Sequence, residues 1–351
     1  MTMLLPQFEL HRPESLQEAV NLAKSFGDDY VFISGGTDLL PNFKCGLNAH
    51  SNVISLQRIP ELKSLSGTEI GAGTTLADIA KCEDLPASVR ECASKVASPL
   101  LRESATLGGN LMLDNRCHFF NQSYFWRNSL GYCLKADGDR CHVVPQIKED
   151  GKNVLNNKVC VATHSSDMAP MLIALGASAT FIGPDGERTI KLNDFYYGCG
   201  IDRFEKKAGE ILVKITLPES AAKVRSAWKK LAPRQSIDFS VVAVAGVLEL
   251  DGNKIVKLKI ALGAVDTTPV LFDYNKEETR KAPDHYLFVN TEENMPDVIG
   301  KECTDELIQE VAKHVQTQAQ PKMNVPLAPD YRKKMCGVLT RRIITEMRDA
   351  K

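Results

Sequence analysis

Four of the ten cysteines lie close together in the middle of the chain, at Cys117, Cys133, Cys141 and Cys160, whereas the other six are scattered. Thiolates gathered in this way are typical of a site that holds zinc or an iron–sulfur cluster. Their spacings of 16, 8 and 19 residues match neither the short pairs of zinc knuckles nor the compact run of ferredoxins. The pattern therefore predicts a long loop that wraps around an ion or a cluster.

The N-terminus and the net charge limit the cellular location and the partners that we expect for such a chain. Its first residues, MTMLLPQFELHRPESLQEAV, lack the basic start and long apolar run of a secretory signal, and no stretch of 18 apolar residues follows. We therefore expect a cytoplasmic chain without membrane insertion, whose cysteines are thiols and metal ligands; an extracellular disulfide framework is the alternative. The net charge of −1 gives no electrostatic reason to expect nucleic-acid binding.

A glycine pair follows a predicted strand near the N-terminus. The apolar run Tyr30–Ser34 leads into Gly35, Gly36, Thr37 and Asp38. Two glycines permit a tight turn and let backbone N–H groups approach a ligand such as a pyrophosphate. An ordinary turn between a strand and a loop explains this motif equally well.

A second glycine pair repeats this arrangement in the middle of the chain. Gly108 and Gly109 are flanked by Thr106 and Asn110, which supply hydrogen-bonding side chains. Two such loops favour a dinucleotide ligand. Neither loop is the GxGxxG fingerprint that joins a strand to a helix, or a GxxxxGK[ST] loop, so a Rossmann fold or a P-loop is not predicted.

A third short turn precedes an apolar helix, and a change of pattern follows. Ser166 is expected to cap the helix from Met168 to Leu175, with Asp167 in its first turn, where a carboxylate complements the helix dipole. After Pro218 the chain changes to long strands and terminal helices, including two apolar strands across Asp251-Gly252-Asn253. This change predicts a separate C-terminal domain.

Three segments together carry a resemblance to a known family. SGGTDLLPNF, ATLGGNL and HSSDMAPML resemble the FAD-binding subunits of the molybdenum hydroxylases, the group of xanthine dehydrogenase and carbon monoxide dehydrogenase. The resemblance implies an α+β fold with a vanillyl-alcohol-oxidase-type (PCMH-type) FAD-binding domain at 1–220, made of subdomains 1–57 and 58–220. It further implies a C-terminal α/β domain at 221–351, as in the carbon monoxide dehydrogenase flavoprotein.

The same resemblance implies the residues that contact FAD. Asp167 would contact the flavin nucleotide, Leu212 would lie near the adenine, and Lys229 would lie by the isoalloxazine ring, with Lys230 as the neighbouring candidate. The two glycine loops would supply the remaining contacts, from Ile33, Ser34, Gly35, Gly36, Thr37, Asp38, Leu39, Leu40, Thr106, Gly109 and Asn110.

The cysteine segment carries a narrower resemblance. RCHFFNQSYFWRNSLGYCLKADGDRCHVV resembles the inserted loop of 4-hydroxybenzoyl-CoA reductase beta subunits, which holds a 4Fe-4S cluster. The insertion would span about 112–162, with Cys117, Cys133, Cys141 and Cys160 as ligands. The stretch PQIKEDGKNVLNNK before the fourth cysteine is longer than in that family and predicts a solvent-facing hairpin or excursion. Zinc is the structural alternative to the cluster. We expect the aromatic residues to shield the cluster from water, namely Phe119, Phe120, Tyr124, Phe125 and Trp126.

The resemblance implies an electron-transfer subunit that has no substrate site of its own. Ferredoxin would deliver electrons to the 4Fe-4S cluster, and FAD would pass them to a 2Fe-2S small subunit and a molybdopterin-containing large subunit, in a dimer of heterotrimers. That complex would reduce an aromatic acyl-CoA. Two alternatives are a hydroxylase subunit whose flavin passes electrons outward to NAD or a quinone, and a zinc-stabilised interaction protein.

Overall fold

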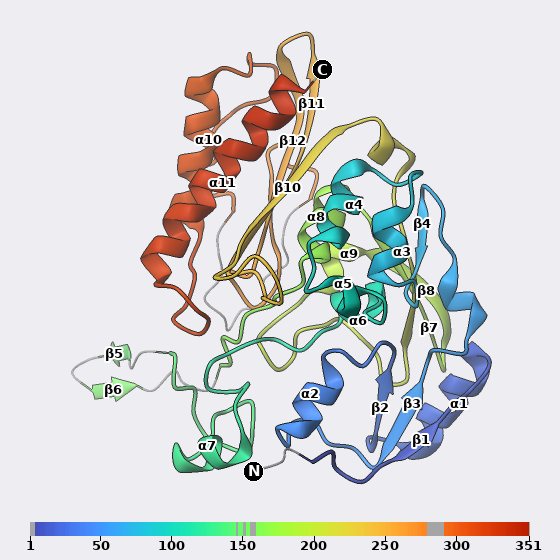
Figure 1. The fold of residues 1–351 in the computed structure, drawn as a ribbon. Helices are drawn as coiled ribbons and strands as arrows, with labels where there is room; N and C mark the ends of the chain where they lie inside the picture. Colours follow the sequence, from blue (N-terminus) through green and yellow to red (C-terminus); the bar gives the residue numbers. More distant parts are fainter. Residues whose placement is uncertain (1–3, 145–146, 150–151, 155–158, 279–290, 351) are drawn as a thin grey trace.

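The part of the chain that the structure describes has three main sheets stacked along one long axis, with helices between and outside them (Figure 1). The computed structural model describes residues 4–144, 147–149, 152–154, 159–278 and 291–350. The smallest of the three sheets is N-terminal and lies at the bottom of the view, and the C-terminal sheet lies at the top (Figure 1). This mixture of parallel and antiparallel sheets with helices confirms the predicted α+β class.

The N-terminal sheet is parallel and has the strand order β1-β3-β2, formed by Glu9–His11, Asn52–Ser55 and Tyr30–Ile33. Helix α1 (Leu16–Phe26) begins where the side chain of Ser15 accepts a hydrogen bond from the N–H of Glu18. Its apolar face, which includes Val20, packs onto the sheet. The strand β2 ends at Ile33, so the first glycine loop leaves from the carboxyl end of a parallel strand.

The middle sheet is antiparallel, with the order β4-β9-β7-β8, formed by Glu69–Gly71, Ile211–Thr216, Ser178–Gly183 and Gly186–Lys191. Short helices cover it and form the largest apolar core. These helices are α3 (Leu76–Lys81), α4 (Ala87–Ser94), α6 (Leu107–Leu111), α8 (Met168–Ala174) and α9 (Leu192–Phe195), whereas α5 (Pro99–Arg102) has no buried residue and lies outside this core. Every residue of α8 is buried, so the chain that leads into it is held firmly at the centre of the molecule.

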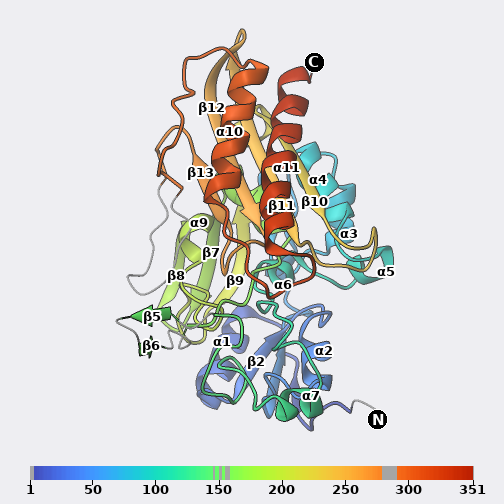
Figure 2. The ribbon, with the colours of Figure 1, turned by 90° about the vertical axis from the view of Figure 1, so that its left-hand side faces the viewer.

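The C-terminal sheet has the order β10-β11-β12-β13, formed by Arg225–Leu231, Val242–Asp251, Lys254–Gly263 and Val270–Asp273. Helices α10 (Asp305–Gln318) and α11 (Pro329–Asp349) lie side by side against one face of it (Figure 2). Its other face contributes residues such as Ala245 to the core around α8. The predicted turn between two long strands is confirmed, since Asp251 pairs with Lys254 across it.

The cysteine segment lies beside the N-terminal sheet. It contains α7 (Tyr124–Ser129) and a two-stranded antiparallel ribbon of β5 (Ile147–Glu149) and β6 (Lys152–Val154), which extends away from the main body (Figure 1). These two strands confirm the predicted hairpin, although the residues that join them and those at 155–158 lie outside the described part. The remaining short helices are α2 (Leu39–Lys44) and the 3-10 turns η1 (Pro60–Lys63) and η2 (Glu219–Ala222).

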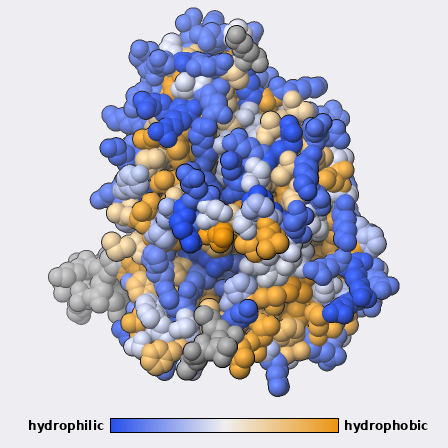
Figure 3. All heavy atoms as spheres, viewed as in Figure 1, coloured by the Kyte–Doolittle hydropathy of each residue, from blue (hydrophilic) through white to orange (hydrophobic). Residues whose placement is uncertain are grey.

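Within the described part, every helix is too short or too polar to cross a membrane. The face in Figure 3 is mainly hydrophilic over the C-terminal elements, and apolar residues gather across its middle and its lower part. The predicted domain limits at 57 and 220 and the insertion at 112–162 stay predictions.

Candidate functional site

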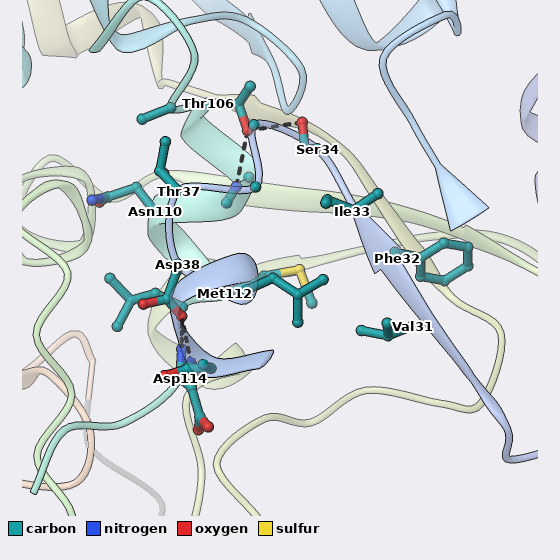
Figure 4. A pocket seen from close by; sticks show the side chains of 18 of the residues that line it. Val31, Phe32, Ile33, Ser34, Thr37, Asp38, Thr106, Asn110, Met112 and Asp114 are labelled. Carbon is teal, nitrogen blue, oxygen red and sulfur yellow. Dashed lines mark hydrogen bonds between the residues drawn. The ribbon is translucent and has the colours of Figure 1, made fainter. Parts of the chain in front are cut away.

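One large cavity lies where the N-terminal sheet meets the middle sheet and its helices. It has a volume of about 700 Å³, within the range of small-molecule and cofactor sites. Its wall comes from the first glycine loop, the second glycine loop, the turn before α8, strand β9 and the segment that follows β10. Figure 4 shows the part of the wall that the two glycine loops form. Segments far apart in the sequence therefore form one site.

The first glycine loop forms the wall of the cavity from Ile33 to Leu39. Gly36 has a φ of +71°, a conformation that side chains other than glycine rarely adopt, and this lets the chain turn from β2 into α2. Asp38 accepts a hydrogen bond of 3.1 Å from the N–H of Asp114 and forms an ion pair with Arg116. The loop is thereby tied to the chain that follows the second glycine pair (Figure 4).

The second glycine loop lies directly beside the first. The hydroxyl of Thr106 accepts a hydrogen bond of 3.2 Å from the N–H of Gly109 and donates one of 3.0 Å to Ser34 (Figure 4). A Cβ atom on Gly35 would lie 1.9 Å from the carbonyl oxygen of Ser104, so only glycine permits this approach of the two loops. The structure thus brings together the two motifs that the sequence singled out.

The turn before α8 adds a buried carboxylate. Asp167 lines the cavity and is 3% exposed. Its carboxylate accepts hydrogen bonds from Lys230, at 3.2 Å, and from Ser240. Burial raises the pKa of Asp167, although Lys230 and Ser240 act in the opposite direction. The carboxylate is therefore held by protein groups, and the pair with Lys230 spans the middle and C-terminal elements.

Side chains around Asp167 connect this turn to the second loop. Asn110 accepts hydrogen bonds from the hydroxyl of Ser166, at 2.7 Å, and from the N–H of Met168, at 3.2 Å. The predicted capping role of Ser166 is confirmed, because its hydroxyl accepts a hydrogen bond of 3.0 Å from the N–H of Ala169. Leu212 on β9 is buried and also lines the cavity.

Two of the predicted flavin contacts, Lys229 and Leu40, are not among the residues that line this cavity. The ammonium group of Lys229 forms an ion pair with Glu346 on α11, whereas that of Lys230 forms one with Asp167. Neighbouring residues of a strand point to opposite faces, which explains why Lys230 reaches Asp167, a wall residue of the cavity, and Lys229 reaches α11. Leu40 lies beneath the first loop, where its side chain would be 3.2 Å from a Cβ on Gly36.

The sequence reasoning missed the charged residues that line this cavity. Arg116, Lys135, Arg203 and Lys206 all contribute to its wall. Burial lowers the pKa of Arg116 to about 10, and its guanidinium lies 4.2 Å from the ring centre of Phe239. No local pattern marks these four cations, which come from three separate segments. Arg116 and Lys135 lie within two residues of the clustered cysteines Cys117 and Cys133, which was the one available signal, whereas Arg203 and Lys206 lie beside none of the sequence motifs.

The lining suits a dinucleotide on chemical grounds. Backbone N–H groups of two glycine loops and several cations favour the phosphates, and apolar residues such as Leu212 favour a ring. The Nε atoms of Arg116 and Arg203 are buried without a hydrogen-bond partner. Such buried donors are costly unless a ligand or water accepts from them. The site therefore offers unused hydrogen-bond donors to an anionic ligand.

The four clustered cysteines line a second, smaller cavity together with Phe119, Phe120, Leu134, Lys135, His142, Val143 and Ala162. The four cysteines of this cavity are not joined by disulfide bonds. Burial raises the pKa of Cys117 to about 11 and that of Cys160 to about 12, so both are protonated at neutral pH when no metal is bound. Metal binding would have to displace these protons.

Backbone donors are directed at three of the four sulfurs. N–H groups of Phe119 and Phe120 act on Cys117, those of Lys135 and Ala136 on Cys133, and that of Ala162 on Cys160, in each case favouring the thiolate. Such N–H donors to sulfur are a means by which proteins stabilise and tune iron–sulfur clusters. The segment therefore has features of a thiolate ligand site beyond the cysteines themselves.

The four sulfurs surround a space and do not converge on a point. Within the described residues, no three side chains of His, Cys, Asp or Glu come together in a group that could hold a metal ion. A zinc ion would need four sulfurs at about 2.3 Å from one centre. The arrangement thus does not form a ready single-ion site.

The predicted aromatic shield is only partly present, and the prediction for three residues was wrong. Phe119 and Phe120 line the cysteine cavity. In contrast, Tyr124, Phe125 and Trp126 lie on α7 and are 58%, 73% and 36% exposed. The reason is that a short helix buries only one side, and the buried residue of α7 is Arg127. Its guanidinium donates hydrogen bonds to the carbonyl oxygens of Cys45 and Gln122.

Comparison with known proteins identifies similar chains. Residues 6–220 match the family described as the FAD-binding domain in molybdopterin dehydrogenase, and residues 227–277 match the carbon monoxide dehydrogenase flavoprotein C-terminal domain. The chain is 32% identical over 253 residues to the aldehyde oxidoreductase FAD-binding subunit PaoB of Escherichia coli, a match that covers 68% of this chain and 75% of that one. It is 27% identical to the carbon monoxide dehydrogenase medium chain of Afipia carboxidovorans, over 97% of each chain.

Solved structures share the fold. The reconstituted carbon monoxide dehydrogenase from Oligotropha carboxidovorans superimposes with a TM-score of 0.73 at 23% identity, over 98% of this chain and 99% of that chain. Quinoline 2-oxidoreductase from Pseudomonas putida gives a TM-score of 0.69 at 21% identity, over 98% of both chains. These matches place the sheets described above in a known architecture.

Proposed function

Because the chain belongs to the family of FAD-binding domains in molybdopterin dehydrogenases, we propose that it is an electron-transfer subunit that carries both FAD and a 4Fe-4S cluster. In this proposal it works in a complex with a molybdopterin-containing large subunit and a 2Fe-2S small subunit. The complex would resemble 4-hydroxybenzoyl-CoA reductase and reduce an aromatic acyl-CoA on the large subunit. This chain would supply the electrons.

The observation that carries the proposal is the pair of neighbouring cavities. The four cysteines line one cavity, the glycine loops line the other, and Lys135 lies in the wall of both. FAD and a 4Fe-4S cluster supply, between them, one-electron and two-electron redox chemistry. The protein would hold the two groups in adjoining sites and exclude water from the space between them.

The residues of the flavin cavity have separable tasks. Gly36 and Gly109 would allow the backbone to approach the pyrophosphate, and Arg116 and Arg203 would donate to its oxygens. Asp167 would hold a hydroxyl group of the nucleotide, and Leu212 would pack on the adenine. Lys230, which is paired with Asp167, would take the position by the isoalloxazine ring that the resemblance implied for Lys229.

The residues of the cysteine cavity support a cluster better than a zinc ion. Four thiolates that surround a space suit a group with several metal atoms, and the N–H donors near Cys117, Cys133 and Cys160 would stabilise its negative charge. Ferredoxin is the proposed electron donor, since it delivers single electrons at low potential. Electrons would then pass through this chain toward the molybdenum subunit.

Anaerobic purification tests the proposal directly. We expect about four irons, about four sulfides and one FAD per chain, and rapid flavin reduction by reduced ferredoxin but not by NADH. Zinc in place of iron, or a protein with flavin and no metal, would contradict the proposed cluster. The assay uses the chain in its complex, so that missing partner subunits do not limit cofactor loading.

A second candidate function has support from the relatives. Those reported above are named as the medium chain of a carbon monoxide dehydrogenase and the FAD-binding subunit of an aldehyde oxidoreductase, and a dehydrogenase takes electrons from its substrate. In that case the flavin of this chain would pass electrons outward to NAD or a quinone. Reduction of the flavin by NADH, with ferredoxin without effect, would favour this candidate.

A further inference from the structure

Lys135 connects the cysteine cavity to the flavin cavity. Among the described residues, it is the one that lines both. Its side chain is 6% exposed, and its ammonium group lies 4.8 Å from the ring centre of Phe120, a wall residue of the cysteine cavity. The same ammonium group donates to Asp114, at 2.7 Å, and to the carbonyl oxygen of Gly200, at 2.5 Å. Lys135 is therefore fixed between the two sites.

The partners of Lys135 belong to opposite sides of this boundary. Asp114 lines the flavin cavity, where it also binds Arg203 at 3.1 Å and Asn48 at 2.7 Å. Gly200 packs against the cysteine cavity, because a Cβ on it would lie 2.7 Å from the sulfur of Cys160. The ammonium group of Lys135 thus links the backbone beside Cys160, a proposed cluster ligand, to the ion pairs that Asp114 forms in the wall of the flavin cavity.

We propose that Lys135 is an electrostatic tuning residue that raises the reduction potential of the cluster and that Asp114 partly offsets this effect from the flavin side. The inference rests on the proposed function, because it assumes that the four cysteines hold a cluster. It concerns a fixed positive charge and requires no change in the protonation of Lys135. Through Asp114, the occupant of the flavin cavity would influence how readily the cluster accepts an electron.

The physical reason is the charge that reduction adds. A cluster bound by four thiolates is negative, and one further electron makes it more negative. A cation at the wall of the same cavity stabilises the reduced form more than the oxidised form, and its effect is strong because burial reduces screening by water. The carboxylate of Asp114, held at 2.7 Å from this cation, weakens the effect.

Two variants with opposite expected signs test the proposal. Lys135→Met keeps the length of the side chain and removes its charge, so the cluster should become harder to reduce by about tenfold in equilibrium constant, or about 59 mV for one electron. Asp114→Asn removes the offsetting charge and should shift the potential in the positive direction. The measurement is an anaerobic redox titration of the cluster in the intact complex, followed by electron paramagnetic resonance.

Two further variants are controls. Lys135→Arg retains the charge and should restore a potential close to that of the unmodified protein. Lys214→Met removes an equal charge from a lysine that pairs with Glu69 outside both cavities, and it should leave the potential unchanged. Flavin content is measured in each variant to verify the fold. If the Lys135→Met protein does not hold a cluster, the reduction potential of the cluster in the Asp114→Asn protein is the measurement that tests the proposal.

The outcomes separate this inference from the proposed function. Opposite shifts in Lys135→Met and Asp114→Asn, with Lys135→Arg close to the unmodified protein, support it. An unchanged potential in Asp114→Asn and in any Lys135→Met protein that holds a cluster overturns the inference and leaves the proposed function intact. Absence of iron and sulfide from the unmodified complex overturns both.

Discussion

The hydroxyl of Thr106 donates a hydrogen bond of 3.0 Å to the hydroxyl of Ser34 and so joins the two glycine loops across 72 positions of sequence. The same oxygen accepts from the N–H of Gly109. One side chain thus sets the separation of two backbone segments that face the same cavity (Figure 4). A bulky side chain added at this junction would enter the space that a ligand needs.

Gly109 therefore gives the first prediction. A Cβ at this position meets only the hydroxyl of Thr106, at 3.2 Å, within 4 Å, so a longer side chain would project into the cavity. We expect Gly109→Leu to weaken FAD binding by at least about tenfold, or about 1.4 kcal/mol. Equilibrium dialysis of the flavin-depleted protein measures this affinity. Gly109→Ala is the control, because it adds only a methyl group and should bind FAD nearly normally.

A substitution at Gly36 should also weaken FAD binding, but through the conformation of the backbone. Its φ of +71° costs roughly 1–2 kcal/mol for a residue with a Cβ, and valine at this position would also contact Ile33 and Leu40. We expect Gly36→Val to lose both flavin and some stability. Full FAD occupancy in Gly36→Val and in Gly109→Leu would remove the two loops from the binding site.

The sequence predicted these loops because glycine pairs and capping residues are local patterns. The half-buried cations Arg116 and Arg203 have no such pattern, and their position depends on how the sheets pack. The sequence could not show which of Lys229 and Lys230 points toward the flavin cavity either. That choice depends on which face of β10 is turned to the cavity, and a sequence alone does not define this. The four cysteines were recognisable by their clustering, but Lys135 beside them was not, since one lysine in a loop is usually a solvated side chain.

Asp167 and Lys230 give the second prediction. Asp167→Ala leaves the ammonium group of Lys230, whose side chain is 13% exposed, without its carboxylate. Breaking a buried pair in this way destabilises a fold by about 3–5 kcal/mol. We therefore expect a lower free energy of unfolding and weaker FAD binding, with iron content nearly unchanged because the cysteines lie elsewhere. Urea unfolding, flavin and iron analysis measure the three quantities.

A double variant separates the fold from the ligand. Asp167→Ala combined with Lys230→Met removes both charges, so most of the lost stability should return. FAD binding should stay weak if the carboxylate contacts the nucleotide. If affinity recovers together with stability, or if iron and flavin fall together in the single variant, Asp167 acts through the fold.

His164 gives the third prediction, which concerns pH. It is 1% exposed, and burial lowers its pKa to about 3 from an ordinary value of 6.5. Between these values the unfolded chain binds a proton that the folded chain does not, so stability must fall as the pH falls from about 6.5 toward 3. At pH 4 the loss from this residue is about 3 kcal/mol, since one pKa unit corresponds to about 1.4 kcal/mol.

His164→Gln tests this dependence because glutamine is neutral at every pH and can still donate to the carbonyl oxygen of Leu111, which the histidine ring meets at 3.3 Å. Urea unfolding at pH 7 and pH 4 should show a smaller loss of stability in the variant than in the unmodified protein. Other groups titrate equally in both proteins, so the difference isolates His164. Equal losses would show that the ring accepts a proton in the folded chain.

The cysteine cavity gives the fourth prediction. Thiolate ligands hold a 4Fe-4S cluster, so Cys133→Ser or Cys141→Ser should abolish it or reduce its iron content severely. Cys82→Ser and Cys303→Ser are matched controls, because these cysteines lie outside the cavity and should leave iron unchanged. FAD should remain in all four variants, since neither cluster cysteine lines the flavin cavity. Iron, sulfide and flavin per chain measure this outcome.

The same variants decide the route of electrons. If electrons enter through the cluster, flavin reduction by ferredoxin should fall by at least about a hundredfold in Cys133→Ser, a barrier increase of about 2.7 kcal/mol. Artificial dyes that reduce flavin directly should still work, because the flavin cavity is intact. Ferredoxin-dependent reduction that survives loss of the cluster would mean that electrons reach the flavin by another path. The chain would then act as a flavin subunit whose cysteine segment has a structural role.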